Sequence, residues 1–335
     1  MRIRGRIDVW ATIMLLCLIL LISFVLVVSP TPIRAQETKF PSRPIEILVP
    51  FVPGGFIDVG CRILSDPLSR ELKVPIVIKN QPGAGGLIGC SAFLNTKPNG
   101  YTILASTGSG VISTVRLSKT PAFDPRRDLL PIAYIADSPV AMSIPKNSPC
   151  KSFDNFVQLA RNNPGKLKGG FSVVGGESHI MFLSIVRDTK IDTKIVPYVG
   201  TGQLHTAVLG GHLDWATASL PSVMPYARSE DMRILLLTRR SPDLPGVPSG
   251  LDVGLSNISF NMWMGLFLLP QTPRPIYDRL VSALSAVAKD PDVAKKLTSA
   301  GFNIAYKNPQ EFSTLINEQW DIFARVIKET DLKVD

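Results

Sequence analysis

Histidine and cysteine, the side chains that most often hold metals or carry nucleophilic chemistry, are scarce in this sequence. The 335 residues include three histidines and four cysteines. His205 and His212 are seven positions apart, which is not the one-turn spacing of a helical zinc pair. His179 follows Ser178 at a predicted helix start, where a neutral cap or a ligand contact fits better than a general base. The sequence therefore predicts no catalytic residue and no metal site.

The motifs of nucleotide-binding proteins and of serine hydrolases are also missing. No segment ends in the Gly-Lys-Ser/Thr of a phosphate-binding loop, and the glycines of residues 83–89 have the wrong spacing for a dinucleotide fingerprint. No Gly-x-Ser-x-Gly elbow occurs, which leaves an exported α/β hydrolase as a remote alternative. The net charge is +9, but the basic residues are scattered and form no block interleaved with aromatics. We expect no cofactor and no nucleic-acid partner.

One long apolar run is present, and it lies at the N-terminus. Three arginines within residues 2–6 precede an uncharged stretch from Val9 to Val28, which predicts that everything after it is exported. The stretch is longer than that of a usual cleaved signal. Residues 1–35 are therefore either a signal peptide cleaved after Ala35 or a retained membrane anchor. In both cases the folded part is expected in the periplasm.

Three cysteines follow the leader, and an odd number does not suggest a disulfide framework. Cys61 and Cys90 fall in two neighbouring predicted helices. Two alternatives stay open for them, namely a bridge between the two helices or two buried free thiols.

Short apolar strands alternate with helical patterns, which predicts an α/β fold with mostly parallel sheets. Two long extended stretches, at 131–145 and 262–270, are expected to cross between two lobes and to form a hinge. The predicted lobes are 36–138 plus 260–335, and 139–259. A ligand cleft is expected between them. Strands are expected at 45–50, 75–80, 101–107, 171–174, 194–198, 213–218 and 232–237, and helices at 57–72, up to 95, at 152–162, and from about 177, 201 and 221.

Glycine-rich turns recur where a predicted strand passes into a helix. Glycine lets the backbone approach a ligand closely, and a helix N-terminus offers unpaired N–H groups with partial positive charge. Several such ends facing one cleft would bind an anion without any arginine. The alternative is that each turn is only a tight connection. Asp58, three residues after Gly55, either interacts with the helix dipole or contacts a polar group of the ligand.

Nine short motifs follow one another in order from Phe40 towards the C-terminus. They are Pro41-Ser-Arg-Pro-Ile, Val49-Pro-Phe-Val-Pro-Gly-Gly-Phe-Ile-Asp, Asn80-Gln-Pro-Gly-Ala-Gly-Gly-Leu-Ile-Gly, Pro98-Asn-Gly-Tyr-Thr-Ile-Leu, Phe123-Asp-Pro, Asn163-Pro-Gly-Lys-Leu, Val196-Pro-Tyr-Val-Gly-Thr-Gly, Leu209-Gly-Gly-His-Leu-Asp and Leu244-Pro-Gly-Val-Pro. Together they resemble the Bug family, the periplasmic substrate-binding components of tripartite tricarboxylate transporters. The resemblance implies a two-lobe, type II-like periplasmic binding protein fold and no catalysis.

The resemblance also implies where a ligand would bind. In such proteins the loop matching Pro53–Gly55 holds a ligand carboxylate, partly through ordered water, and hydroxyls and backbone groups of three further loops complete the pocket. The implied ligand is a dicarboxylate, an amino acid or an aromatic acid. The candidate site residues are Phe51, Val52, Pro53, Gly54, Gly55, Asp58, Ser106, Thr107, Gly175, Gly176, Glu177, Ser178, His179, Tyr198, Gly200, Thr201 and Ser219.

Partners follow from the same resemblance. A monomer is expected whose closed form contacts membrane transporter subunits, and the alternative partner is a membrane sensor kinase. Two positions depart from the family pattern. Val173 stands where many relatives have glycine, and Ala218 stands where many have an acidic residue. These departures leave the ligand unassigned and weigh most against amino acids.

Overall fold

The computed structural model describes residues 10–18, 40–118, 121–255, 258 and 260–330. Residues 10–18 are helical, and Phe40–Asp335 is a separate compact unit. Within the described residues, none of the helices has both the length and the apolar character that crossing a bilayer requires. Most of the predicted leader, residues 1–9 and 19–35, lies outside the described residues, so export and cleavage stay predictions.

The first sheet has six strands in the order β11-β4-β10-β3-β1-β2. Apolar side chains alternate between its two faces, as the period of a strand requires. In β1, Ile45, Ile47 and Val49 pack with α2, α10 and α11, whereas Leu48 packs with α3 and α12 on the other face. The strands are β1 (Ile45–Val49), β2 (Ile76–Asn80), β3 (Thr102–Ser106), β4 (Leu130–Ser138), β10 (Met262–Leu268) and β11 (Asn303–Lys307), and the long helices are α2 (Phe56–Leu72), α3 (Leu87–Leu94), α10 (Arg274–Ala288), α11 (Pro291–Ser299) and α12 (Pro309–Thr330).

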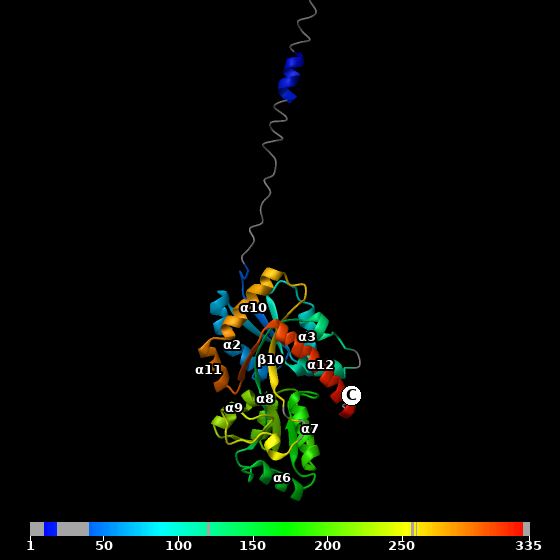
Figure 1. Ribbon diagram of the computed structural model, residues 1–335, viewed down its shortest axis with the longest axis vertical. Helices are drawn as coiled ribbons and strands as arrows, with labels where there is room; N and C mark the ends of the chain where they lie inside the picture. Colours follow the sequence, from blue (N-terminus) through cyan, green and yellow to red (C-terminus); the bar gives the residue numbers. More distant parts are fainter. Residues whose placement is uncertain (1–9, 19–39, 119–120, 256–257, 259, 331–335) are drawn as a thin grey trace, which may run out of the picture. The chain divides into compact units, whose positions relative to one another are not determined.

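The second sheet has five strands in the order β7-β6-β8-β5-β9. Helices α6 and α7 pack on one face and α8 and α9 on the other. Figure 1 shows these four helices gathered around the second sheet, apart from the helices of the first. The strands are β5 (Val140–Pro145), β6 (Lys168–Phe171), β7 (Lys194–Pro197), β8 (Trp215–Ser219) and β9 (Met232–Leu237), and the helices are α6 (Phe153–Asn162), α7 (Glu177–Thr189), α8 (Thr201–Leu209) and α9 (Leu220–Arg228).

The α/β class and the two lobes are confirmed. Strand β4 of the first sheet is followed after Pro139 by β5 of the second, and β10 returns the chain to the first sheet. The predicted stretches at 131–145 and 262–270 are therefore the strands that link the sheets. The residue-level lobe boundaries stay a prediction.

The expectation of mostly parallel sheets was wrong, because both sheets are mixed. Strands β1–β2, β1–β3, β6–β7 and β6–β8 pair in parallel. Every antiparallel pair includes β4, β5 or β10, which lead from one sheet to the other. Parallel pairing needs a crossover connection of a dozen or more residues, usually a helix. Antiparallel pairs need no such crossover, so the strands that link the two sheets can pair antiparallel with their neighbours.

The strand predicted at 171–174 was also misplaced, since β6 is Lys168–Phe171. Its two glycines gave no apolar signal in the sequence. A Cβ added to Gly169 would lie 2.3 Å from Cε2 of Trp215, and one added to Gly170 would lie 2.7 Å from Cδ1 of Leu213. Glycine is required at these positions because large core side chains pack directly on the strand backbone.

Cys61, Cys90 and Cys150 are buried free thiols, so the alternative of a Cys61–Cys90 bridge was wrong. Burial raises the pKa of the Cys90 thiol to about 12 and the pKa of Cys61 still further. Both thiols therefore stay protonated and unreactive at neutral pH.

Candidate ligand-binding site

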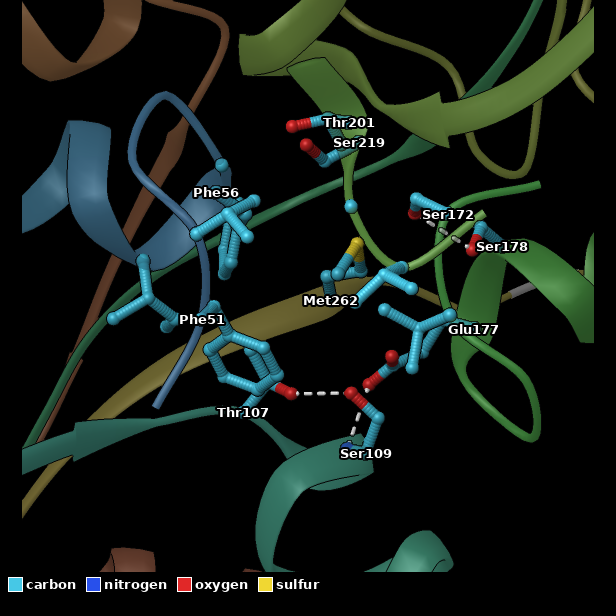
Figure 2. Close-up of a pocket in the computed structure, with 16 residues that line it drawn as sticks. Phe51, Phe56, Thr107, Ser109, Ser172, Glu177, Ser178, Thr201, Ser219 and Met262 are labelled. Carbon is cyan, nitrogen blue, oxygen red and sulfur yellow. Dashed lines mark hydrogen bonds between the residues drawn. The ribbon is translucent and has the colours of Figure 1, made fainter. Parts of the chain in front are cut away.

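A pocket of about 490 Å³, a volume that includes open solvent at its mouth, is lined by turns from both lobes. Figure 2 shows these turns converging from the two sides. The first residues of α2, α7 and α8 take part, together with the start of the helical turn η2 (Ser109–Ser113). The lining consists of Phe51, Val52, Gly55, Phe56, Ile57, Thr107, Ser109, Ser172, Val173, Glu177, Ser178, Val199, Gly200, Thr201, Ser219 and Met262.

The first-lobe turn between β1 and α2 is held by the carboxylate of Asp58. Its Oδ2 accepts a hydrogen bond from the Gly54 N–H at 2.9 Å and one from Nε of Arg62 at 2.8 Å. The Asn80 amide donates to Oδ1 of Asp58 and to the Phe51 carbonyl, both at 3.0 Å. Gly54 has φ +77°, a conformation that glycine adopts without strain. These bonds fix the backbone that presents Gly55 to the pocket.

Asp58 thus acts inside the protein and does not line the pocket. Burial by itself raises the pKa of Asp58, but the hydrogen bonds from Arg62, Gly54 and Asn80 outweigh burial and hold that pKa below its ordinary value. The carboxylate is therefore ionised at neutral pH. The sequence analysis offered two roles for Asp58, and neither included its hydrogen bonds with the Gly54 N–H, Arg62 and Asn80.

The second-lobe turn between β6 and α7 is held by His179. The Gly175 N–H donates to Nδ1 of His179 at 3.1 Å, and the imidazole stacks on Phe171 with ring centroids 4.1 Å apart. Burial lowers the pKa of His179 to about 4, so the ring is neutral at pH 7 and can accept this bond. His179 therefore stabilises the turn as an acceptor, a role that the sequence analysis did not specify.

Glu177 joins the two lobes across the pocket. Its Oε1 accepts a hydrogen bond from the Ser109 N–H at 3.2 Å. Its Oε2 is buried and has no hydrogen-bond partner within the described part of the chain. The residue is 6% exposed, and burial raises the pKa of its carboxyl.

The first turn of α8 lies close to the first lobe. A Cβ added to Gly200 would lie 2.3 Å from Cγ2 of Val52, so only glycine permits this approach. The buried hydroxyl of Thr201 has no partner among the described residues. Ser219, which precedes α9, donates to Oγ of Ser222 at 3.1 Å. Figure 2 shows Thr201 and Ser219 together, away from Glu177.

Nine of the predicted site residues line this pocket, and eight do not. The nine are Phe51, Val52, Gly55, Thr107, Glu177, Ser178, Gly200, Thr201 and Ser219. Two pairs among the others hold the turns, because Asp58 accepts the Gly54 N–H and His179 accepts the Gly175 N–H. The eight are Pro53, Gly54, Asp58, Ser106, Gly175, Gly176, His179 and Tyr198. The departing residue Val173 lines the pocket, whereas Ala218 is buried and does not.

Seven lining residues were missed by sequence reasoning. Phe56 and Ile57 have the pattern of helix core, and Met262 begins the linking strand β10. Ser109 carried a signal that could have been used, because its hydroxyl follows Thr107 and Gly108 in a glycine-flanked turn. The seven are Phe56, Ile57, Ser109, Ser172, Val173, Val199 and Met262.

Comparison with known proteins assigns the chain to a family. Residues 61–332 match the family described as tripartite tricarboxylate transporter family receptor, and the chain belongs to it. BugT from Bordetella pertussis is 27% identical over 307 residues, which cover 90% of this chain and 93% of BugT. The resemblance to the Bug family is thereby confirmed.

Two solved structures support the same assignment. A periplasmic transporter is 32% identical with a TM-score of 0.84, covering 88% of this chain and 100% of that chain. MatC from Rhodopseudomonas palustris, solved with bound malate, is 27% identical with a TM-score of 0.77, covering 86% of this chain and 100% of MatC.

Proposed function

We propose that this family member is a non-catalytic periplasmic receptor that captures a small organic carboxylate between its lobes and presents it to membrane transporter subunits. One observation carries the proposal, namely that the N-termini of α2, α7 and α8 meet at one pocket. Each offers backbone N–H groups and the positive end of a helix dipole, which favour a bound anion.

The lining supports an anion held by amides rather than by a cation. None of the sixteen residues is lysine, arginine or histidine. Gly55 leaves room for a ligand to approach the backbone, and the Thr201 hydroxyl has no partner among the described residues. Preorganised donors of this kind replace the hydration that a carboxylate loses on burial. The malate bound to MatC supports a ligand of this chemical class.

Apolar side chains form much of the remaining wall. Phe51, Phe56 and Met262 line the first-lobe side, and Val173 and Val199 line the second. Such a wall favours a ligand with an apolar body besides its charged end. We therefore favour a monocarboxylate or a small diacid over a tricarboxylate.

Capture is proposed to proceed by closure around the linking strands. A carboxylate first binds to the turn at residues 51–55, and the second lobe then adds contacts from α7 and α8. The ligand shifts the lobes towards the closed form only through contacts that the open form lacks. The closed form would then present a distinct surface to the transporter.

A thermal-shift screen of the purified protein against a carboxylate library tests the proposal. A ligand at a hundred times its dissociation constant adds about 2.7 kcal/mol of stability. We expect at least one carboxylate to raise Tm and its uncharged amide to leave Tm unchanged. A library in which no carboxylate raises Tm would contradict the proposed function. Continuous conversion of any bound carboxylate would contradict a non-catalytic role.

A further inference from the structure

The pocket contains one ionisable side chain among its sixteen lining residues, and that side chain is acidic. Glu177 begins α7 and its side chain reaches the first lobe, where Oε1 accepts the Ser109 N–H. Its Oε2 is equally buried and lacks a partner in the described chain. Figure 2 shows the carboxyl directed into the pocket beside Ser109 and Thr107.

The nearby hydroxyl groups pair with one another, and among the described residues none of them is a hydrogen-bond partner of Oε2 of Glu177. Thr107 Oγ1 and Ser109 Oγ are 2.6 Å apart, and Ser172 Oγ and Ser178 Oγ are 3.1 Å apart. A buried acceptor that is left unpaired destabilises the folded protein, because it has lost its hydration without gaining a partner. Oε2 of Glu177 therefore lacks a donor among the described residues, and a ligand that supplies one relieves this cost.

The pocket also has two different polar ends. At one end the Thr201 hydroxyl, which has no partner among the described residues, lies at the start of α8 and close to Gly55. The carboxyl of Glu177, whose Oε2 is the acceptor, lies away from them, beside Ser109. A plain carboxylate near Glu177 would be repelled, because two neighbouring carboxylates disfavour each other's charge. A ligand that has a carboxylate at one end and a hydrogen-bond donor towards the other end would match both ends of the pocket.

We infer that the ligand carries, besides its carboxylate, a hydroxyl or ammonium group that donates a hydrogen bond to Oε2 of Glu177. Glu177 is then a specificity-determining residue of the receptor. This inference rests on the proposed function. The departure at Ala218 weighed against an amino acid as the ligand. Glu177 weakens that argument, because it brings an acidic side chain into the pocket from α7.

Matched ligand series measure the contribution of the donor group directly. Each series holds the acid constant and changes one hydrogen to hydroxyl or ammonium. The three series are succinate, malate and aspartate; 4-methylpentanoate, 2-hydroxy-4-methylpentanoate and leucine; and hexanoate, 6-hydroxyhexanoate and 6-aminohexanoate. Calorimetry on the purified protein gives the dissociation constants. In at least one series the hydroxyl or ammonium member should bind about tenfold more tightly than the unsubstituted acid, as expected of a donor to a charged acceptor.

The variant E177Q separates the role of the carboxylate from that of pocket shape. It keeps the length of the side chain and one oxygen for the Ser109 N–H, but it removes the second acceptor. We expect the preference for the donor-bearing member to fall to about twofold or less, while the unsubstituted acid binds at least as well as before. Glu318→Gln, an exposed change in α12, is the matched control and should preserve the preference.

The outcomes distinguish this inference from the proposed function. Carboxylate binding without any preference for a donor group, or a preference that persists in E177Q, overturns the role of Glu177 and leaves the receptor function standing. No carboxylate binding in any series contradicts the function itself. If circular dichroism shows that E177Q does not fold, Glu177→Asp, which withdraws the carboxyl by one methylene, should show the same loss of preference.

Discussion

The two turns that face each other across the pocket each contain a buried acid near a helix start, and the two acids are used differently. Asp58 in the first lobe and Glu177 in the second are 2% and 6% exposed. Asp58 accepts from Gly54, Arg62 and Asn80, so both of its oxygens are used. Glu177 accepts one backbone N–H, and its second oxygen has no partner among the described residues.

The pKa directions follow from the balance between burial and donors, because Asp58 is hydrogen-bonded to the charged Arg62, whereas the donors to Glu177, from its own backbone and from Ser109, are uncharged. Both carboxyls are buried, which by itself raises a pKa. At Asp58 the donors outweigh burial and its pKa falls, whereas at Glu177 they do not and its pKa rises. An acid with a complete set of donors supports the backbone, and an acid with an incomplete set remains available to a ligand. We propose that the first-lobe turn supplies the backbone that binds the carboxylate and that the second-lobe turn carries selectivity.

The largest effect is expected from blocking the first-lobe turn itself. A Cβ added to Gly55 meets Val52 O at 3.4 Å and Thr201 Oγ1 at 3.8 Å, which are ordinary contacts. Gly55→Val should therefore fold normally, while its methyl groups occupy the pocket. We expect ligand affinity to fall by about a hundredfold or more, with little change in Tm, measured by calorimetry and thermal unfolding. Gly202→Val, at an exposed position of α8 with open space around it, is the control. Unchanged affinity in Gly55→Val would show that the ligand binds elsewhere.

An intermediate effect is expected from removing the charge behind that turn. Asp58→Asn leaves at least one of the donors from Gly54, Arg62 and Asn80 unpaired, which should cost about 2 kcal/mol at pH 7. The lowered pKa of Asp58 gives the sign. Its contribution is complete above the ordinary value of 3.8 and is lost as the pH falls through the lower pKa of the folded state.

Denaturant unfolding of wild type and Asp58→Asn between pH 7 and pH 2 checks this dependence. The difference between the two proteins should narrow towards the acid end. A difference that does not change with pH would mean that packing, not charge, stabilises the turn.

The smallest effect is expected at Glu177 in the absence of ligand. Because its pKa is raised, stability from its protonated form is present below the ordinary value of 4.5 and is lost as the pH rises through the folded-state pKa. Glu177→Gln should therefore be more stable than wild type at pH 7, by about 1 kcal/mol or less, and the gain should vanish near pH 4. Thermal unfolding at the two pH values measures it. A loss of stability at pH 7 would indicate that the ionised carboxylate already has a donor, and the contrast with Asp58 would disappear.

Sequence reasoning was most accurate for elements that local patterns specify. Apolar runs located β1, β9 and β10, and the helix predicted at 152–162 is α6, which Ser152 caps by accepting the Asn155 N–H at 3.2 Å. It was least accurate where a strand lacks apolar side chains, as in β6 with Gly169 and Gly170. Those glycines are explained by the packing of Trp215 and Leu213, which are more than forty residues away in the chain.

In the candidate site, too, sequence reasoning identified the locally specified features and missed those that depend on distant contacts. The glycine turns and their hydroxyls could be identified from the sequence, because a strand followed by glycines and a helix start is a local pattern. The partners of Asp58 and Glu177 could not, because Asn80 and Ser109 reach them from other segments. The sequence by itself determined the α/β class, most of the elements and the family. Only the tertiary structure decided which acid supports the backbone and which faces the pocket, because the number of donors around a buried carboxylate depends on contacts between distant residues.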